Sequence, residues 1–194
     1  MAKARAKTRA KRMVKASGRR AVAGVDAIEL LKADHRRVEQ WFAQFEKARN
    51  DDRKLELANR ICNALTVHTT IEEEVFYPAF IEATRDADLH HEAIVEHAAA
   101  KQLIADIEAT GPDDDYYDAK VKVLSEMIKH HVKEEEQPGG MFAEARKSRM
   151  DLDALGEQLA QRKLELESGM ETVSPGARRS GNGVLNRIVD AGSR

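Results

Sequence analysis

The chain has 194 residues and a formal net charge of −2, a length that fits one domain with extensions and a core that needs no crosslinks. Its single cysteine, Cys62, excludes an internal disulfide and fits a reducing compartment. No run approaches the ~18 consecutive apolar residues of a membrane span, and no apolar segment follows the basic N-terminus as in a secretory signal. We therefore expect a cytoplasmic protein that does not enter the membrane.

Charge is distributed unevenly along the chain. Residues 1–25 contain nine Lys or Arg and no acidic residue, and residues 170–194 contain four Arg against two acids, whereas residues 26–169 carry a net charge of −13. Segments with so little apolar surface cannot offset the entropy that ordering costs. We expect a disordered basic arm at 1–25, a flexible tail at 170–194 and an acidic folded region between them.

Apolar residues recur at steps of three and four in four successive segments, which predicts four amphipathic helices. Asn50 can cap the second helix, and Thr110-Gly111-Pro112 separates the third from the fourth. Pro78 lacks a backbone donor, so we expect a kink or an early end of the second helix near Tyr77. The predicted helices span about 26–48, 52–84, 86–109 and 113–137.

The absence of strand-like alternation in the sequence predicts an all-α protein. The connections are too short for a crossover between parallel neighbours, which predicts an up-down-up-down four-helix bundle over residues 26–137. Pro138-Gly139-Gly140 breaks the fourth helix. We expect a C-terminal helical extension at 138–169, with one helix that begins at about residue 141, carries Leu152, Leu155 and Leu159, and ends at Ser168-Gly169.

Each of the four predicted bundle helices carries a histidine on its apolar stripe, and two of these histidines are followed four residues later by glutamate. Residues four apart share one helix face, so each such pair projects an imidazole and a carboxylate in one direction. Buried alone these groups cost several kcal/mol, whereas a shared metal satisfies them. The alternative is a bundle with buried polar pairs and no metal. It needs a separate explanation for the histidine on the apolar stripe of each of the four helices. The candidate ligands are His35, His68, Glu72, His97, His131 and Glu135.

Two overlapping pairs in the fourth helix have the same spacing, and the apolar stripe decides between them. His131 and Glu135 continue the stripe, whereas His130 and Glu134 lie about 100° away around the helix. The same test selects Glu72 over the glutamates that follow it. We interpret the glutamates that are not selected as part of a solvated face, which can include a residue that supports a ligand. The residues that we place outside the ligand set are Cys62, Glu73, Glu74, His90, His91 and Glu136.

The donor types restrict the metal. Neutral imidazoles and carboxylates without a thiolate suit iron, manganese or zinc. Six protein ligands shared by two six-coordinate ions, with both glutamates bridging, leave open positions, and open positions on iron take dioxygen, peroxide or nitric oxide. Zinc prefers a closed four-coordinate site, which the surplus of ligands disfavours. We therefore expect two iron ions, with manganese or zinc less suited.

The residues around these candidates resemble a known family, the hemerythrin-like or HHE cation-binding domains. The resemblance implies a four-helix bundle with a non-haem, carboxylate-bridged di-iron centre that uses the six candidate ligands. It covers about residues 26–167. The segments that carry it are Ala33-Asp34-His35, His68 to Pro78, Glu96 to Lys101 and His131 to Glu136.

The resemblance also implies a function, namely the binding, sensing or reduction of small oxidants such as dioxygen, nitric oxide or peroxide. Weak peroxidase-like, catalase-like or nitric-oxide-handling activity falls within that range. Oxygen-carrying hemerythrins have a second histidine four residues from the first in the third helix, where this chain has Ala93 and Lys101. Their fourth-helix carboxylate is an aspartate five residues after the histidine, whereas here Glu135 follows His131 by four. These departures favour oxidant handling over reversible oxygen carriage.

A second hypothesis is an iron- or redox-responsive interaction protein whose basic arm contacts nucleic acid. Nine Lys or Arg within residues 1–25 could neutralise several phosphates in a sequence-independent, salt-sensitive contact. The arm is also consistent with a solubilising tail or an unremoved targeting segment. The sequence contains no phosphate-binding glycine loop, no serine-type catalytic arrangement and no zinc-type cysteine spacing.

Overall fold

A computed structural model of the chain describes residue 24 and residues 26–171, and within these residues all regular structure is helical. The expected arm, apart from Gly24, and the expected tail beyond residue 171 lie outside the described residues. No helix in the described part is long and apolar enough to cross a membrane. The elements are α1 (Ala27–Lys47), α2 (Asp51–Ile71), the π-helical segment η1 (Glu72–Phe76), α3 (Tyr77–Thr84), α4 (Ala87–Glu108), α5 (Tyr117–Glu136), α6 (Met141–Lys147) and α7 (Leu152–Glu171).

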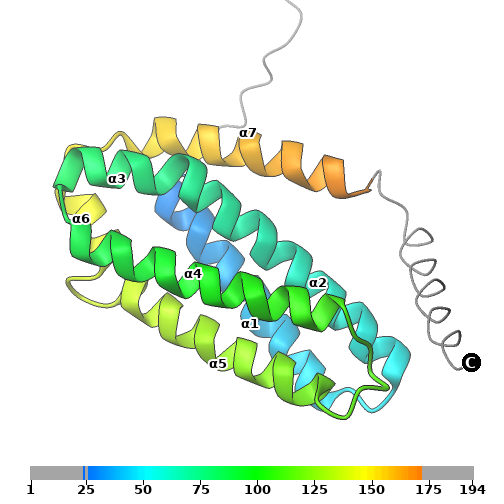
Figure 1. Ribbon diagram of the computed structural model, residues 1–194. Coiled ribbons are helices and arrows are strands. Elements are labelled where there is room, and N and C mark those ends of the chain that lie inside the picture. Colours follow the sequence, from blue (N-terminus) through cyan, green and yellow to red (C-terminus); the bar gives the residue numbers. More distant parts are fainter. Residues whose placement is uncertain (1–23, 25, 172–194) are drawn as a thin grey trace, which may run out of the picture.

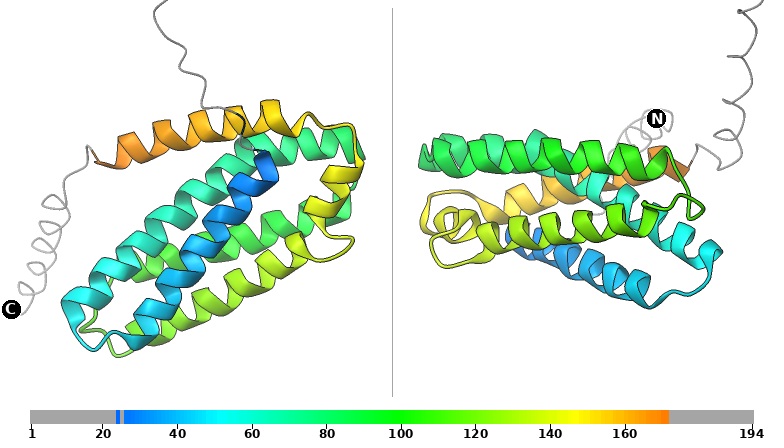
Figure 2. Two further views of the ribbon diagram at one scale, coloured as in Figure 1. Left: turned by 180° about the vertical axis from the view of Figure 1, so that it is seen from behind. Right: turned by 60° about the horizontal axis from the view of Figure 1, so that its bottom comes forward.

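Four long helical segments form the bundle: α1, then α2 continued through η1 and α3, then α4, then α5 (Figures 1 and 2). Each runs antiparallel to its neighbour in the chain, and α5 returns to pack against α1. The additional helix α7 lies across the outside of α1, α2 and η1. The predicted all-α, up-down-up-down bundle with an extra C-terminal helix is therefore confirmed.

Side-chain caps determine where three of the bundle helices begin. Asp26 caps α1, Asn50 caps α2 and Asp86 caps α4, and each accepts hydrogen bonds from backbone N–H groups of the first turn. Arg85, which adopts a left-handed conformation with φ 60°, ends α3 and turns the chain towards α4. These short connections keep consecutive helices antiparallel.

The expected start of the fourth helix near residue 113 is wrong, because α5 begins at Tyr117. The side chain of Asp114 accepts a hydrogen bond from the Tyr116 N–H at 2.7 Å, and the Asp114 carbonyl accepts one from the Tyr117 N–H at 3.0 Å. An aspartate that bonds the backbone in this way offers it an alternative to helix. The stretch before α5 therefore folds as turns.

The expected single C-terminal helix is in fact two helices. Ser148 Oγ accepts a hydrogen bond from the Met150 N–H at 3.2 Å, and the Asp151 side chain then accepts one from the Ala154 N–H at 3.0 Å, which starts α7. The predicted end at Ser168-Gly169 is also wrong, because α7 continues to Glu171. The break after α6 lets α7 fold back across the bundle.

The second bundle helix does not end near Tyr77. It passes instead through η1, where the Tyr77 N–H donates to the carbonyl of Glu72, five residues earlier. Pro78 then lies in the first turn of α3, where its missing N–H is tolerated. The helix therefore accommodates the proline by a wider turn rather than by stopping.

The wider turn changes which residues of this helix face the core. Phe76, Tyr77 and Phe80 are fully buried. Val75 and Ala79, which follow Glu72 at the three-four spacing of a regular α-helix, are only partly buried at the edge of the core. The extra residue in this turn thus rotates the side chains of the following residues about the helix axis.

The buried apolar side chains form two clusters, one at each end of the bundle. We call the cluster around Phe42, Leu57 and Ile104 the turn-end cluster, and the cluster around Phe76 and Phe142 the α7-end cluster. A layer of buried polar residues separates the two. In α1, for example, His35 lies between Leu31 of the α7-end cluster and Val38 of the turn-end cluster.

Candidate metal centre

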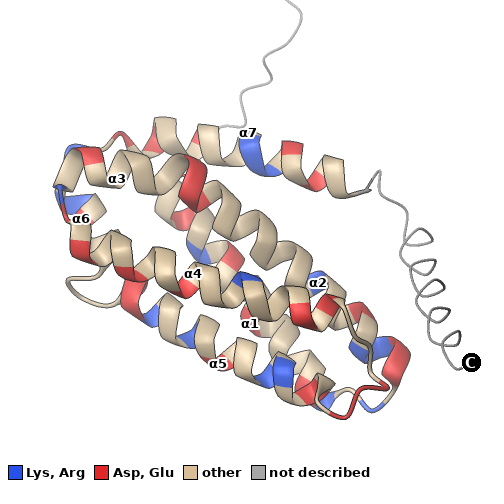
Figure 3. Ribbon diagram, viewed as in Figure 1, with Lys and Arg blue, Asp and Glu red and all other residues tan. Residues whose placement is uncertain are grey.

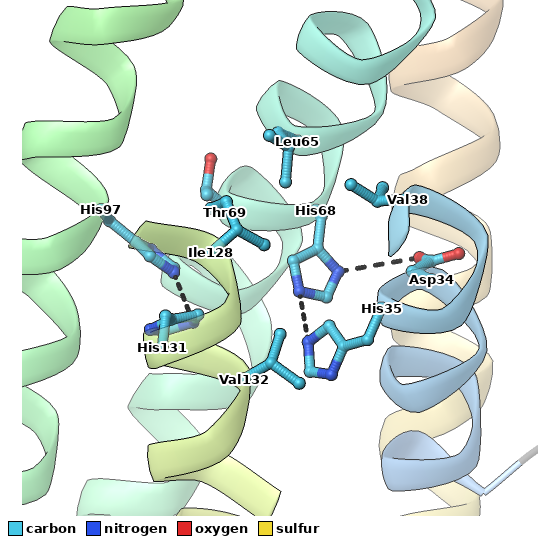
Figure 4. Close-up of a pocket in the computed structure, with 10 residues that line it drawn as sticks. All are labelled: Asp34, His35, Val38, Leu65, His68, Thr69, His97, Ile128, His131 and Val132. Atoms are coloured by element: carbon cyan, nitrogen blue, oxygen red, sulfur yellow. Dashed lines mark hydrogen bonds and ion pairs between the residues drawn. The ribbon is translucent and has the colours of Figure 1, made fainter. Parts of the chain in front are cut away.

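The structure brings all six predicted ligands together in the layer between the two apolar clusters. Each of the six is no more than 5% exposed. The imidazoles form two pairs (Figure 4). In the first pair, His35 Nε2 lies 2.9 Å from His68 Nε2, and in the second pair, His97 Nε2 lies 3.2 Å from His131 Nε2.

The two glutamates link the two pairs. Glu72 Oε2 lies 3.3 Å from His68 Nε2 and 3.4 Å from His97 Nε2, so one oxygen contacts one histidine of each pair. Glu135 Oε2 contacts the other histidine of each pair, at 3.4 and 3.6 Å. Each carboxylate therefore spans the gap between the two pairs.

The donor atoms fall into two overlapping sets in which all atoms lie within 4.8 Å of one another. Glu72 belongs to both sets. Both of its side-chain oxygens, and Oε2 of Glu135, are buried without a hydrogen-bond partner among the described residues. Buried carboxylate oxygens without partners are costly, and a cation between the donors would satisfy them. The sets are His35, His68, Glu72 and Glu135, and Glu72, His97 and His131.

Each imidazole turns Nε2 inward and presents Nδ1 to a carboxylate from a neighbouring helix. Three of these contacts are hydrogen bonds donated by Nδ1. The fourth, from His68, is longer than a hydrogen bond and leaves that Nδ1 without a hydrogen-bond partner among the described residues. A carboxylate on Nδ1 keeps the proton there and leaves the Nε2 lone pair directed inward, which is the form that binds a metal. The pairs are His35 with Glu136 at 2.8 Å, His68 with Asp34 at 3.8 Å, His97 with Glu73 at 2.9 Å and His131 with Glu96 at 2.8 Å.

These four carboxylates, which we call the carboxylate ring, connect the helices cyclically. A carboxylate from α1 faces the histidine of α2, one from η1 faces that of α4, one from α4 faces that of α5, and one from α5 faces that of α1. The sequence allowed for one supporting residue among the glutamates beside the candidate ligands, but it did not indicate that four carboxylates share this role. The available signal was position, because every member of the ring is the immediate chain neighbour of a candidate ligand. Its members are Asp34, Glu73, Glu96 and Glu136.

Burial controls the protonation of the inner groups. It raises the pKa of Glu72 well above its usual range, and the charge of Glu135 nearby raises it further. Burial lowers the pKa of His68 to about 4 and, together with the charge of His131, lowers that of His97 to about 2. Burial therefore favours neutral imidazoles at His35, His68 and His97, and it disfavours a negative charge on Glu72 unless a cation lies beside it. At His131 burial also acts to lower the pKa, but the carboxylates of Glu135 and Glu96 outweigh it and the pKa is raised.

Tyr77 is a further buried residue of the site that the sequence analysis did not identify. Its hydroxyl donates to Glu135 Oε1 at 3.3 Å and lies 3.2 Å from His97 Nε2. Burial raises the pKa of the phenol well above its usual value, so the hydroxyl keeps its proton. Tyr77 is five residues after Glu72, which is off the face of an α-helix, and only the wider turn of η1 places both on the same side.

The residues set aside by the stripe argument lie away from the donor sets. The His130 side chain is 59% exposed and touches Glu96 at 3.4 Å rather than the inner layer. His90 packs edge-on against the ring of Tyr77, and His91 is exposed. Cys62 is buried in the turn-end cluster, where burial raises the pKa of its thiol to about 12.

A small cavity lies among the four imidazoles (Figure 4). Its volume of about 10 Å³ is close to the space that one water molecule occupies. Apart from the histidines, its lining is mostly apolar and includes Leu65, Ile128 and Val132. Two surface hollows reach the same layer, one of about 210 Å³ that touches His35 and one of about 200 Å³ that touches His97.

The segment after α5 fixes the end of the helix that carries Glu135. Gly139 has φ 85°, a left-handed conformation suited to glycine. A Cβ on Gly140 would lie 2.2 Å from the carbonyl oxygen of Glu134, so only glycine allows the turn to pack this closely. The Pro138-Gly139-Gly140 segment is therefore a tight closure of α5.

Comparisons with known proteins agree with this geometry. Residues 26–138, more than half of the chain, match the family described as "Hemerythrin HHE cation binding domain". A crystal structure of a hemerythrin HHE cation-binding domain-containing protein from Mycobacterium kansasii has the same fold, with a TM-score of 0.63, 24% identity, and coverage of 76% of this chain and 91% of that one.

A curated relative adds a second similarity. The chain is 27% identical over 108 residues to a protein named "DNA nickase" from Nostoc sp. (strain PCC 7120 / SAG 25.82 / UTEX 2576). The match covers 56% of this chain but only 30% of that protein. The similarity therefore concerns a part of the longer protein.

Proposed function

This chain belongs to the hemerythrin HHE cation-binding domain family, and from that premise we propose that it holds two iron ions and binds, senses or reduces small oxidants. The proposed ligands are the four inward imidazoles and the two glutamates between them. The proposed oxidants are dioxygen, nitric oxide and peroxide. Their small size agrees with a cavity of about 10 Å³.

The observation that carries this proposal is the position of the two glutamates. Glu72 and Glu135 each contact one histidine of both pairs, and three of their four oxygens have no hydrogen-bond partner among the described residues. A buried layer of that kind is costly without a cation and well suited to two cations that share carboxylates. We propose that both glutamates bridge.

The choice of iron follows from the donors. Imidazole and carboxylate donors without thiolate suit iron, whereas zinc favours four ligands and this layer offers six for two ions. Manganese is the next candidate. Iron supplies reversible one-electron chemistry and open positions for a diatomic or peroxide ligand, which is why we propose oxidants as the partners.

The residues around the cavity favour small ligands. The protonated hydroxyl of Tyr77 lies within hydrogen-bond distance of Glu135 and His97 and could also donate to a ligand there. Apolar side chains such as Leu65 and Val132 exclude larger polar molecules. The carboxylate ring accepts hydrogen bonds from Nδ1 of three of the imidazoles and so keeps their Nε2 atoms available.

The test is metal content together with a visible spectrum. We expect two iron ions per full-length chain after expression with iron, with absorption typical of an oxygen-bridged iron pair that changes on addition of peroxide or nitric oxide. Removal of the metal should lower the melting temperature, because a ligand that binds only the folded state stabilises it. A purified protein that holds no more metal than its His68→Ala variant would overturn the proposal.

A second candidate function is contact with nucleic acid through residues 1–25, in a protein that works in the cytoplasm. It is favoured by the nine Lys or Arg of this segment and by the similarity to a protein named DNA nickase. We expect binding to duplex DNA that weakens steeply with salt and disappears when residues 1–25 are removed. Equal binding by the full and shortened chains would refute the arm as the contact.

A further inference from the structure

The helix α7 lies beyond the segment that matches the family, yet it reaches the carboxylate that faces His68 of the first histidine pair. It packs against α1, α2 and η1. Figure 3 shows a basic segment in the middle of α7, on the stretch that crosses the bundle. Two consecutive residues of this segment make ion pairs with different helices: Arg162 with Glu74 of η1, at 2.6 Å, and Lys163 with Asp34 of α1.

Asp34 is the member of the carboxylate ring that faces His68. Its side chain is 9% exposed, whereas those of Glu73, Glu96 and Glu136 are 28%, 21% and 14% exposed. Water therefore stabilises the other three carboxylates more than it stabilises Asp34. A carboxylate buried to this extent needs a cationic partner within the protein.

The cations that face Asp34 are unequal. Lys163 contacts Oδ1, and its side chain is only 17% exposed. Arg37 lies 3.7 Å from the same oxygen, but it is 53% exposed and can turn into solvent. The other oxygen, Oδ2, lies 3.8 Å from His68 Nδ1. Lys163 is thus the buried contact that holds this carboxylate beside the imidazole.

We propose that Lys163 is a positioning residue for the metal bound by the first histidine pair, and that α7 thereby makes the two metal positions unequal. The proposal rests on the proposed metal centre. Lys163 holds the Asp34 carboxylate, Asp34 orients the imidazole of His68, and His68 presents Nε2 to the metal. The second pair has no such contact with α7 among the described residues.

The consequence is a difference in metal retention. Loss of a residue that orients a metal-binding histidine typically weakens metal binding 10–100-fold. Because Lys163 acts on one pair only, its removal should affect one ion and leave the other unchanged. Loss of general stability would instead affect both ions together.

The experiment compares iron release from the full-length protein to a chelator, together with the metal content before chelation. In Lys163→Met, which keeps the apolar stem, we expect one of the two ions to leave about 10-fold faster or more, and the second to leave at the wild-type rate. Lys163→Arg restores the cation and should behave like the wild type. Arg162→Met removes the neighbouring cation without touching Asp34 and should also release iron at the wild-type rate.

The carboxylate itself gives the second arm of the test. Asp34→Asn should accelerate release of the same ion, and adding Lys163→Met to it should cause little further change, because the two residues act in series. The proposal is overturned if Lys163→Met releases both ions at wild-type rates. It is also overturned if Lys163→Met and Arg162→Met accelerate both ions equally, since docking of α7 alone would then explain the effect. A wild-type protein that binds no metal overturns the metal centre itself, a result distinct from either of these.

Discussion

The two histidine pairs use the same residue types at the same helical spacing, but their surroundings differ. The first pair, His35 and His68, lies under α7, and one of its carboxylates is the buried Asp34. The second pair, His97 and His131, is supported by two partly exposed carboxylates and touches the hydroxyl of Tyr77. The repeated motif determines which donors converge, and elements outside the motif determine how each pair is held.

The largest expected effect comes from the residue that both pairs share. Glu72→Ala should lose both ions, because Glu72 Oε2 contacts His68 of one pair and His97 of the other. Elemental analysis of the purified variant measures the loss, with His91→Ala, which changes an exposed histidine, as the control. Full metal content in Glu72→Ala would show that the pairs bind independently of it.

Single histidine variants separate the pairs. His68→Ala and His131→Ala should each lose at least half of the metal, because each removes a donor from one of the two sets. His130→Ala should keep the full content, since its side chain is exposed and directed away from the inner layer. Loss of metal in His130→Ala but not in His131→Ala would mean that the end of α5 is rotated in solution.

A smaller effect concerns the pH dependence of stability in metal-depleted protein. The folded-state pKa of Glu72 is raised, so its contribution to stability is present at low pH and is lost as the pH rises through that pKa. The glutamine of Glu72→Gln cannot ionise. As the pH rises from 5 to 8, the free energy of unfolding of this variant should therefore increase relative to that of the wild type, by about 1.4 kcal/mol for each unit of pKa shift. Urea unfolding at pH 5 and at pH 8 measures the difference in free energy of unfolding between the variant and the wild type. A difference that does not change with pH would contradict the raised pKa.

The smallest expected effect concerns the hydroxyl of Tyr77. Tyr77→Phe removes the hydroxyl that donates to Glu135 and should cost about 1 kcal/mol while both ions are retained. Thermal unfolding measures this cost, and Tyr116→Phe, at a residue that is 72% exposed, is the matched control. Equal stability of the two variants would show that the hydroxyl bond contributes nothing.

The bundle and the burial of the candidate ligands could be predicted because both follow from one regular period. Residues such as Leu31, His35 and Val38 recur every three or four positions, and the structure buries them on one face of α1. Convergence of the six candidates then needs only antiparallel packing at matching heights. Their role as metal ligands remains a prediction that the experiments above address.

Residues that break the period were not predictable by the same reasoning. Tyr77 reaches the site only because η1 adds a residue to one turn, and no apolar spacing signals such a turn in advance. Asp34 and Glu73 lie about 100° from the stripe on their own helices and point to a neighbouring helix. Lys163 contacts Asp34 across 129 positions of the chain. This contact depends on the hydrogen bonds of Ser148 and Asp151, which end α6 and start α7 so that α7 folds back across the bundle.

The cyclic arrangement of the carboxylate ring has a consequence for the order of folding. His97 and His131 meet their carboxylates across 24 and 35 positions of the chain, whereas His35 meets Glu136 across 101. Closing so long a loop is entropically the most expensive step, and it requires α5 to be complete and docked on α1. A chain emerging from the ribosome therefore carries His35, the first of the candidate ligands, without its carboxylate until nearly the whole bundle has been synthesised.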